Sequence, residues 1–234
     1  DDVESRGLGD VYKRQVLIPV FAIGKSQEML FNIHRFKQQG VIPANTPVYF
    51  GGLSAKVSLL YDRFAGLTRR HDHEFKLKEE IQTVPLPRKG KAPLVCSPGN
   101  IYVVSSGMMT ENTLSNVVAE QVLPQEKNAI LFVGYADPDS PAGLLKATPE
   151  GELVKMRPNG QPVRRKCTVD CFDFSGHATR DSLVNYAVKL NPRQVVLVHG
   201  DPDAVEWMHH TLSAKMPDST IVVPEPGRRY TFEP

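Results

Sequence analysis

Short apolar runs alternate with segments of helical periodicity, and this pattern constrains the fold of the chain more than any other feature. The apolar run VLIPVFAI spans residues 16–23, and apolar side chains then recur at helical spacing from Met29 to Phe36 until Gly40 ends the pattern. The same order of strand and helix returns down to a last apolar run at Thr220–Val223. Strands that alternate with helices of about ten to fifteen residues predict an α/β fold with a largely parallel sheet.

The same periodicity assigns the segments in between. A second strand is expected at Pro47–Phe50, followed by a helix whose apolar stripe includes Leu60 and Phe64. Residues 66–93 lose periodicity and gain charge and proline, so they are expected to form a surface excursion. The other expected elements are strands at Leu94–Ser97 and Ile101–Ser105, a helix at Thr113–Val122, a strand at Ala129–Tyr135, a strand pair within Val154–Phe174 that turns at Pro158-Asn159-Gly160, a helix at Asp181–Leu190, a strand at Gln194–Val198, a helix at Ala204–Ala214 and a strand at Thr220–Val223.

Composition and charge exclude several other classes of protein. The 234 residues are 41% hydrophobic and 23% charged, which is typical of a soluble globular protein with a core and excludes a disordered or collagen-like chain. No apolar run approaches the length of about eighteen residues that a membrane span needs, and the polar N-terminus does not resemble a secretory signal. Lys and Arg number 28 against 26 Asp and Glu, so a nucleic-acid role must be argued from local residues.

The three cysteines form no disulfide framework, and their odd number fits a reducing cytoplasm. Cys167, Val169 and Cys171 would share one face of a strand, so the two cysteines are expected to be buried there. A zinc-binding pair is the alternative. A structural zinc site usually brings two such pairs, however, and Cys96 is the only other thiol.

The first fifteen residues are expected to be foreign to the natural protein. The string SRGLGDVYKRQ at Ser5–Gln15 resembles the in-frame translation of a transposase adapter used in preparing sequencing libraries, and a natural polar tail is the alternative. The nucleotide sequence distinguishes the two, because a natural gene would show codons unrelated to the adapter. Residues 16–234 are accordingly expected to be the C-terminal part of a longer protein.

Two local motifs resemble parts of a nucleotide-binding loop and of a dinuclear metal site, but both are incomplete. Gly24-Lys25-Ser26 resembles the end of a phosphate-binding loop, but the glycine required five positions earlier is Pro19, so a nucleoside triphosphatase is not expected. Ser26 is instead expected to cap the following helix, whose free amides can hold a phosphate. His71 and His73 begin an H-x-H pattern without the D-H half of a dinuclear metal site, and we expect solvated loop histidines there. His209-His210, within a predicted helix, is expected to be surface and boundary packing rather than a site.

Two glycine-flanked histidines near the C-terminus give the strongest functional signal. His199 follows the apolar residues of VVLVHGDPD, so a buried strand delivers it at its carboxyl end, where open α/β sheets place ligand sites. His177, in DFSGHA, stands just before a predicted helix whose free amides favour an anion. Core packing could explain either histidine alone, but not two at strand-to-helix junctions.

FSGHA and LVHGD resemble the paired late motifs of the β-CASP nucleases of the metallo-β-lactamase fold, the group that includes ribonuclease J. VLIPVFAIGKSQEML, SSGMM at Ser105–Met109 and VGYADPDSPAGLL at Val133–Leu145 resemble three further motifs of this family, in the family's order. The resemblance covers residues 16–234. It implies a β-CASP domain of Rossmann-like α/β layers at 16–165, followed at 166–234 by the C-terminal part of a metallo-β-lactamase αββα domain.

The resemblance also implies the activity, a zinc-dependent hydrolysis of the RNA backbone. His199 would ligate one of two zinc ions, and His177 would be the acid that protonates the leaving oxygen. A histidine at 199 is associated with the RNA-cleaving branch, so RNA is the expected partner; Arg164-Arg165-Lys166 and Arg69-Arg70 could contact its backbone or be solvated. The positions expected to contact phosphate or RNA are Ser175, Gly176, Ala178, Ser26, Ser106 and Gly107.

The chain departs from the family at the metal centre. The H-x-H-x-D-H cluster, the other metal ligands and the acidic partner of the late histidine precede the β-CASP domain in the family, and none is in this sequence. One histidine cannot hold two zinc ions, so the chain alone is expected to be inactive. A metal-free RNA-binding or scaffold subunit of the same family is the alternative. The sequence leaves open endonuclease against exonuclease action, the RNA target and the oligomeric state, including a homodimer.

Overall fold

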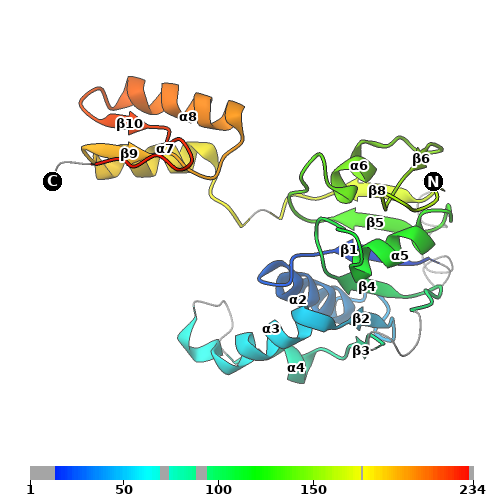
Figure 1. The fold of residues 1–234 in the computed structure, drawn as a ribbon. Coiled ribbons are helices and arrows are strands. Elements are labelled where there is room, and N and C mark those ends of the chain that lie inside the picture. The colour runs from blue at the N-terminus through cyan, green and yellow to red at the C-terminus, as the bar shows by residue number, and fades with distance from the viewer. Residues whose placement is uncertain (1–13, 69–73, 88–93, 175, 232–234) are drawn as a thin grey trace, which may run out of the picture. The chain divides into compact units, whose positions relative to one another are not determined.

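The computed structural model describes residues 14–68, 74–87, 94–174 and 176–231 of the chain. The chain divides into two compact units, Asp1–Phe174 (unit 1) and Ser175–Pro234 (unit 2). In Figure 1 the helices and strands of unit 1 run from blue to yellow and those of unit 2 from yellow to red. Within the described ranges, no helix combines the length and the apolar character needed to cross a membrane.

Unit 1 is built on a six-stranded sheet in which every neighbouring pair of strands is parallel. The strand order is β3-β2-β4-β1-β5-β8, with Leu17 of β1 paired to Tyr102 of β4 and to Ile130 of β5. This arrangement confirms the predicted α/β fold. The strands are β1 Val16–Pro19, β2 Val48–Phe50, β3 Val84–Pro85, β4 Ile101–Val104, β5 Ala129–Phe132 and β8 Thr168–Cys171.

Helices cover both faces of this sheet (Figure 1). Leu17 belongs to a core formed with α5 and α6, whereas the next residue, Ile18, belongs to a separate core formed with α2 and α4. Successive strand residues point to opposite faces, so the two cores lie on opposite sides of the sheet. The helices of unit 1 are α2 Lys25–Gln38, α3 Gly52–Arg63, the 3-10 helix η1 Ala65–Leu67, α4 Leu77–Glu80, α5 Leu114–Val122 and α6 Pro141–Ala147.

The apolar stripe expected on α3 is not its buried face. Leu60 and Phe64 are 52% and 45% exposed, while Ser54 and Ser58 are buried. The reason is Gln27 of α2, whose side-chain amide donates hydrogen bonds to the carbonyl oxygen of Ser54 and to the hydroxyl of Ser58. Small polar residues on α3 therefore meet a polar side chain of α2. Of the expected stripe, Tyr61 packs against the core and Val57 is half-buried, whereas Leu60 and Phe64 remain exposed.

Two further expectations in unit 1 are wrong. The apolar segment Leu94–Ser97 is not a strand, because the Gln121 side chain bonds its backbone at Leu94 and Cys96. The expected excursion at 66–93 contains α4 and β3, and β3 extends the sheet beside β2. The expected strand pair after Val154 is a short antiparallel hairpin of β6 Leu153–Val154 and β7 Val163–Arg164, and β8 follows it.

Two of the cysteines lie beside or within the edge strand β8, and they differ in burial. Cys167 is fully buried, as expected, and burial raises the pKa of its thiol to about 11. Cys171 is exposed, so its expected burial is wrong; β8 is the edge strand of the sheet, next to β5 only. Because β8 belongs to unit 1, the compact units divide after Phe174, later than the domain boundary expected at residue 165. That domain boundary stays a prediction.

The described residues of unit 2, 176–231, form two parallel strands and two helices. The elements are α7 Arg180–Leu190, β9 Gln194–Val196, α8 Pro202–Lys215 and β10 Thr220–Val222. Val184 of α7 and Leu212 of α8 form its core with Val195 and Leu197. The intervening residues Val196 and Val198 are 42% and 70% exposed, so this unit leaves the opposite face of its sheet uncovered.

Gly143 in α6 provides a stability prediction for unit 1. A Cβ atom at this position would lie 2.7 Å from Cα of Pro138 and would overlap the carbonyl group of Asp137. We expect Gly143→Ala to lower the free energy of unfolding of unit 1 by about 3 kcal/mol, because the turn must move away from the helix. Urea unfolding followed by far-UV circular dichroism measures this.

The matched control for this variant is Gly134→Ala, since a Cβ atom at Gly134 meets no atom within 4 Å. It should change the free energy of unfolding by less than about 0.5 kcal/mol. Fluorescence of Trp207, the one tryptophan of the chain, follows unit 2 separately and should not change in either variant. Equal effects of the two alanines would contradict the close contact at Gly143.

Candidate functional site

The two histidines singled out in the sequence occupy equivalent positions in unit 2. His177 precedes by two positions the residue that caps α7, Thr179, whose hydroxyl accepts a hydrogen bond from the amide of Ser182 at 3.2 Å. His199 likewise precedes by two positions Asp201, the N-cap residue of α8. Both histidines are exposed.

The starts of α7 and α8 lie toward the same edge of the small sheet. Because α8 connects the parallel strands β9 and β10, it starts at the carboxyl end of β9, and α7 ends just before the opposite end of that strand. The guanidinium of Arg180 lies 4.7 Å from the ring centroid of Trp207, which joins the first turn of α7 to α8. The structure therefore places His177 and His199 toward one edge of this sheet, each shortly before a helix.

His199 has an unusual backbone. Its φ is +61°, in the left-handed region that costs a residue with a Cβ atom roughly 1–2 kcal/mol. The neighbouring Gly200 is required sterically, because a Cβ atom there would lie 2.9 Å from Cγ2 of Val205. Within the described part of the chain, the His199 side chain has no hydrogen bond or ion pair that would offset this cost. A strained, exposed histidine is typical of a functional residue rather than of a packing residue.

This geometry predicts that His199→Gly stabilises unit 2. Glycine adopts a positive φ without a Cβ clash, so the free energy of unfolding should rise by up to about 1 kcal/mol. His199→Ala is the control, since alanine retains the Cβ atom and should give no gain. Urea unfolding followed by Trp207 fluorescence measures both variants, and an equal gain for alanine would contradict the strain at this position.

The other expected residues of this motif are only partly described. Gly176 and Ala178 are exposed beside His177, and Ser175 lies outside the described residues. Their contact with phosphate stays a prediction. His209 and His210 lie on α8, where His209 is half-buried and His210 is exposed and 3.9 Å from Glu206, as expected for surface and boundary packing. His71 and His73 lie outside the described residues.

The described residues do not fit the two zinc ions that the resemblance implies. Across ranges 14–68, 74–87, 94–174 and 176–231, no group of three or more His, Cys, Asp or Glu side chains could hold a metal. Zinc sites in proteins use three or four protein ligands, and His199 alone supplies one. His199 as a zinc ligand therefore stays a prediction that depends on ligands from elsewhere.

In unit 1, the carboxyl ends of β1 and β4 form the second candidate region. These strands are neighbours, but the chain leaves β1 for α2 on one face of the sheet and leaves β4 for α5 on the other. Such a point of divergence is where open α/β sheets bind ligands. The Ser105–Met109 turn follows β4 here.

The turn after β4 is closely packed. A Cβ atom at Gly107 would lie 3.1 Å from the ring of Phe21, which follows β1, so this position favours glycine. The hydroxyl of Ser106 is 3.1 Å from that of Thr110 and accepts a hydrogen bond from the Thr110 amide at 3.3 Å. The structure thus explains Gly107 by packing, and the expected contact of Ser106 and Gly107 with RNA stays a prediction.

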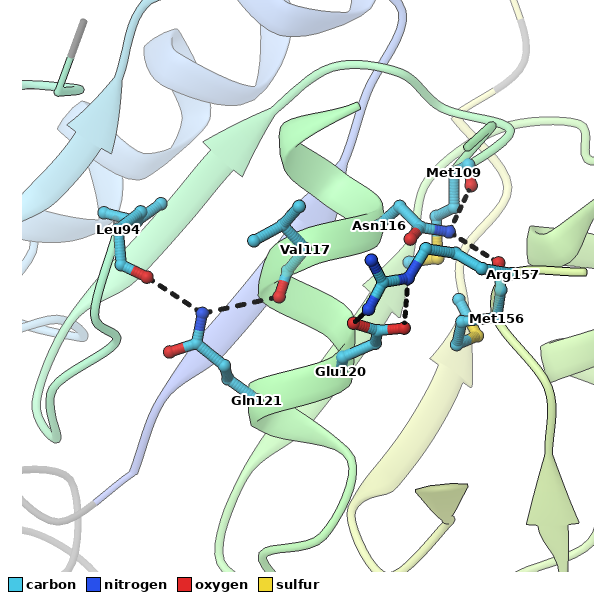
Figure 2. A network of polar contacts seen from close by, with 8 residues as sticks. All are labelled: Leu94, Met109, Asn116, Val117, Glu120, Gln121, Met156 and Arg157. Carbon is cyan, nitrogen blue, oxygen red and sulfur yellow. Dashed lines mark hydrogen bonds and ion pairs between the residues drawn. The ribbon is translucent and has the colours of Figure 1, made fainter. Parts of the chain in front are cut away.

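Side chains of α5 hold this turn in place (Figure 2). The buried amide of Asn116 donates hydrogen bonds to the carbonyl oxygens of Met109 and Met156, each at 2.8 Å. One turn further along, Glu120 accepts two hydrogen bonds from Arg157, at 2.8 and 2.5 Å. Sequence reasoning missed this network. The available signal was a polar Asn116 among the apolar residues of α5.

Ser26 does not have its expected role. The N-cap residue of α2 is Gly24, with a φ of +77°, and Ser26 is fully buried with its hydroxyl donating to the carbonyl oxygen of Ala22. The predicted cap is therefore wrong, because the chain enters the helix through a left-handed glycine instead. Burial of Ser26 also disfavours its predicted contact with phosphate.

The basic run at 164–166 is used within unit 1. Arg164 and Arg165 donate hydrogen bonds to the carbonyl oxygens of Gly151 and Thr148, and Lys166 lies 3.6 Å from Glu126. The two arginine contacts hold the turn before β6, whereas Lys166 and Glu126 pair at the surface, with 45% and 76% of their side chains exposed. Contact of this run with the RNA backbone stays a prediction. Arg69 and Arg70 lie outside the described residues.

Comparison with known families agrees with this geometry. Residues 26–145, about half of the chain, match the Beta-Casp domain. The chain belongs to the β-CASP family. Residues 162–224 of this β-CASP chain match a second domain, the Zn-dependent metallo-hydrolase RNA specificity domain, which contains both histidines. The family resemblance inferred from the motifs is thereby confirmed, as is the α/β fold class.

Curated relatives match most of the β-CASP chain at low identity. The Integrator complex subunit 11 homolog of Dictyostelium discoideum is 26% identical over 86% of the chain, and transcription termination factor FttA of Methanocaldococcus jannaschii is 27% identical over 80%. Endoribonuclease YSH1 of Mycosarcoma maydis is 24% identical over 86%. The chain spans 28%, 31% and 23% of the lengths of these relatives, respectively.

Proposed function

We propose that this chain is part of a zinc-dependent ribonuclease of the β-CASP family. One observation carries the proposal: a Beta-Casp domain is followed by an RNA specificity domain in which His177 and His199 lie toward one edge of the sheet. The printed name of one relative, an endoribonuclease, supports RNA as the substrate class. The use of cysteine supports a cytoplasmic location.

The chain would contribute three kinds of group to the reaction: an acid, a phosphate contact and a metal ligand. His177, exposed before α7, would hold the proton that passes to the leaving oxygen of the RNA. The exposed backbone of Gly176 and Ala178 at the same helix start would contact a phosphate of the substrate. His199 would be a metal ligand, and the remaining ligands would come from residues outside this chain.

The exposed apolar face of the unit 2 sheet supports the proposal that another part of the protein packs against it. Val196 and Val198 expose adjacent apolar surface on β9 and just beyond it, which isolated domains rarely leave open. We propose that the N-terminal half of the protein covers this face. The isolated chain should accordingly tend to aggregate, and the same chain expressed with a family-like N-terminal half should remain monodisperse in size-exclusion chromatography.

Zinc analysis and an RNA cleavage assay test the proposal on the chain alone and on the chain joined to a family-like N-terminal half. Alone, the chain should retain well under one zinc ion after dialysis and should cleave no RNA. The joined protein should bind zinc and cleave RNA until a chelator is added. Near-stoichiometric zinc or chelator-sensitive cleavage by the chain alone would contradict the shared metal site. Zinc binding without cleavage in the joined protein would instead favour a non-catalytic subunit.

A further inference from the structure

We propose that Lys25 is a positioning residue that holds the end of unit 1, from which the segment carrying His177 leaves. The role assigned to His177 rests on the proposed ribonuclease function, whereas the contact itself does not. Lys25 opens α2 and Phe174 is the last residue of unit 1, 149 positions later in the chain. The Gly24-Lys25-Ser26 segment, which has no complete phosphate-binding motif, acquires a role through this contact.

Three contacts locate the Lys25 ammonium group. Its Nζ donates a hydrogen bond to the carbonyl oxygen of Phe174 and lies 5.9 Å from the centroid of the Phe174 ring. The same Nζ is 2.5 Å from a carboxylate oxygen of Glu28, one turn along α2. The Lys25 side chain is only 14% exposed. Withdrawing an ammonium group from water is costly unless it is paired and hydrogen-bonded, so these partners stabilise the buried side chain.

The topology of the sheet brings these residues together. The strands β1 and β8 are both parallel to β5, so they end at the same edge of the sheet. Lys25 follows β1 at this edge, and Phe174 follows β8 and packs against the core on the α2 side. The carbonyl group that Lys25 binds is three positions before His177, at the end of unit 1.

Hydrogen exchange of the full 234-residue chain tests the contact. Lys25→Met removes the charge and the donor but keeps much of the aliphatic stem. Within residues 172–178, the amides of Phe172 and Phe174 donate to backbone carbonyl oxygens, and their exchange should rise by about tenfold, the usual effect of losing a charged hydrogen bond. Lys25→Arg keeps a charged donor and should restore most of the protection. Strand β4 should exchange as in the unsubstituted chain in both variants.

Lys37→Met is the matched control. Lys37 lies at the other end of α2, and its Nζ also donates to a backbone carbonyl, that of Thr46, at 2.5 Å. This variant should affect exchange only around Thr46. If Lys25→Met also exposed β4, Glu28→Gln would replace it, because that change removes the carboxylate and leaves the lysine in place. A rise at 172–178 is again expected, smaller than for loss of the donor, and no rise would overturn the proposal.

A nuclear magnetic resonance measurement tests the positioning of His177. Its imidazole signals should shift in Lys25→Met and return in Lys25→Arg, while those of His209 and His210 remain unchanged. Unchanged exchange at 172–178 would overturn the contact. Increased exchange with unchanged His177 signals would overturn the positioning role. Neither measurement uses RNA or zinc, so both stand if the ribonuclease proposal fails.

Discussion

Replacing His177 with alanine is expected to slow RNA cleavage by about 100- to 10,000-fold in the chain joined to a family-like N-terminal half, the usual contribution of a positioned acid. Zinc content should not change, because the proposed role of His177 is to deliver a proton and not to bind metal. Single-turnover cleavage of an RNA oligonucleotide, with zinc measured on the same samples, gives both quantities.

His199→Ala should fail in a different way. It removes the proposed metal ligand, so zinc content and activity should fall together. His210→Ala is the control for both variants, because His210 is exposed on α8 and has no proposed role. If His177→Ala and His199→Ala lowered zinc content equally, the division of roles would be wrong. The same holds if His177→Ala left the rate unchanged for leaving groups that need protonation.

Asn116→Asp is expected to destabilise unit 1 by about 3–5 kcal/mol at pH 8, since it leaves a buried charge without a partner. The wild-type amide donates to the carbonyl oxygens of Met109 and Met156, both at 2.8 Å, as Figure 2 shows. A carboxylate in the same place would face two oxygens and could donate to neither. The turn after β4 would lose its support at the same time.

The pH dependence of this variant has a definite sign. Burial raises the pKa of a carboxyl group, so the folded variant retains its proton above the pKa of about 4 found in the unfolded chain. The folded variant is therefore most stable, relative to wild type, at low pH, and loses stability as pH rises through the raised pKa. Urea unfolding at pH 5 and pH 8 should show the larger deficit at pH 8.

Gln121→Glu is the matched control for Asn116→Asp. It makes the same amide-to-acid change on the same helix, but Gln121 is only partly buried. Its cost should be smaller and less dependent on pH. A cost for Asn116→Asp within about 0.5 kcal/mol of the control, or equal at the two pH values, would contradict the structural role assigned to this amide.

The elements that could be predicted from the sequence are those whose burial follows from local pattern. The helix α2 has buried Met29, Leu30 and Ile33 at helical spacing and is followed by Gly40 with a φ of +73°. The sequence of this short segment alone therefore predicts where the helix lies and where it ends. The predictions of the strand at Leu94–Ser97 and of the buried face of α3 failed because a side chain from a distant part of the sequence binds the segment. Gln121 binds the backbone of Leu94, 27 positions away, and Gln27 pairs with the serines of α3.

The candidate site also combines residues that local sequence features predict with residues whose partners are distant in the sequence. His177 and His199 stand beside glycines at helix starts, and those features are local, so both positions were predictable. Asn116 and Lys25 were not, because their partners lie 40 and 149 positions away and no periodicity marks such pairs. Ser26 shows the opposite error, since a serine near a helix start suggested a cap although Gly24 already occupies that position.

Cleavage of matched RNA and DNA oligonucleotides by the joined protein tests the central claim most directly. The proposed ribonuclease should cleave the RNA strand in the presence of zinc, stop when a chelator is added, and leave the DNA strand of the same sequence intact. Equal cleavage of both strands, or no cleavage of RNA by a joined protein that carries its zinc, would contradict the claim that this chain is part of a zinc-dependent ribonuclease.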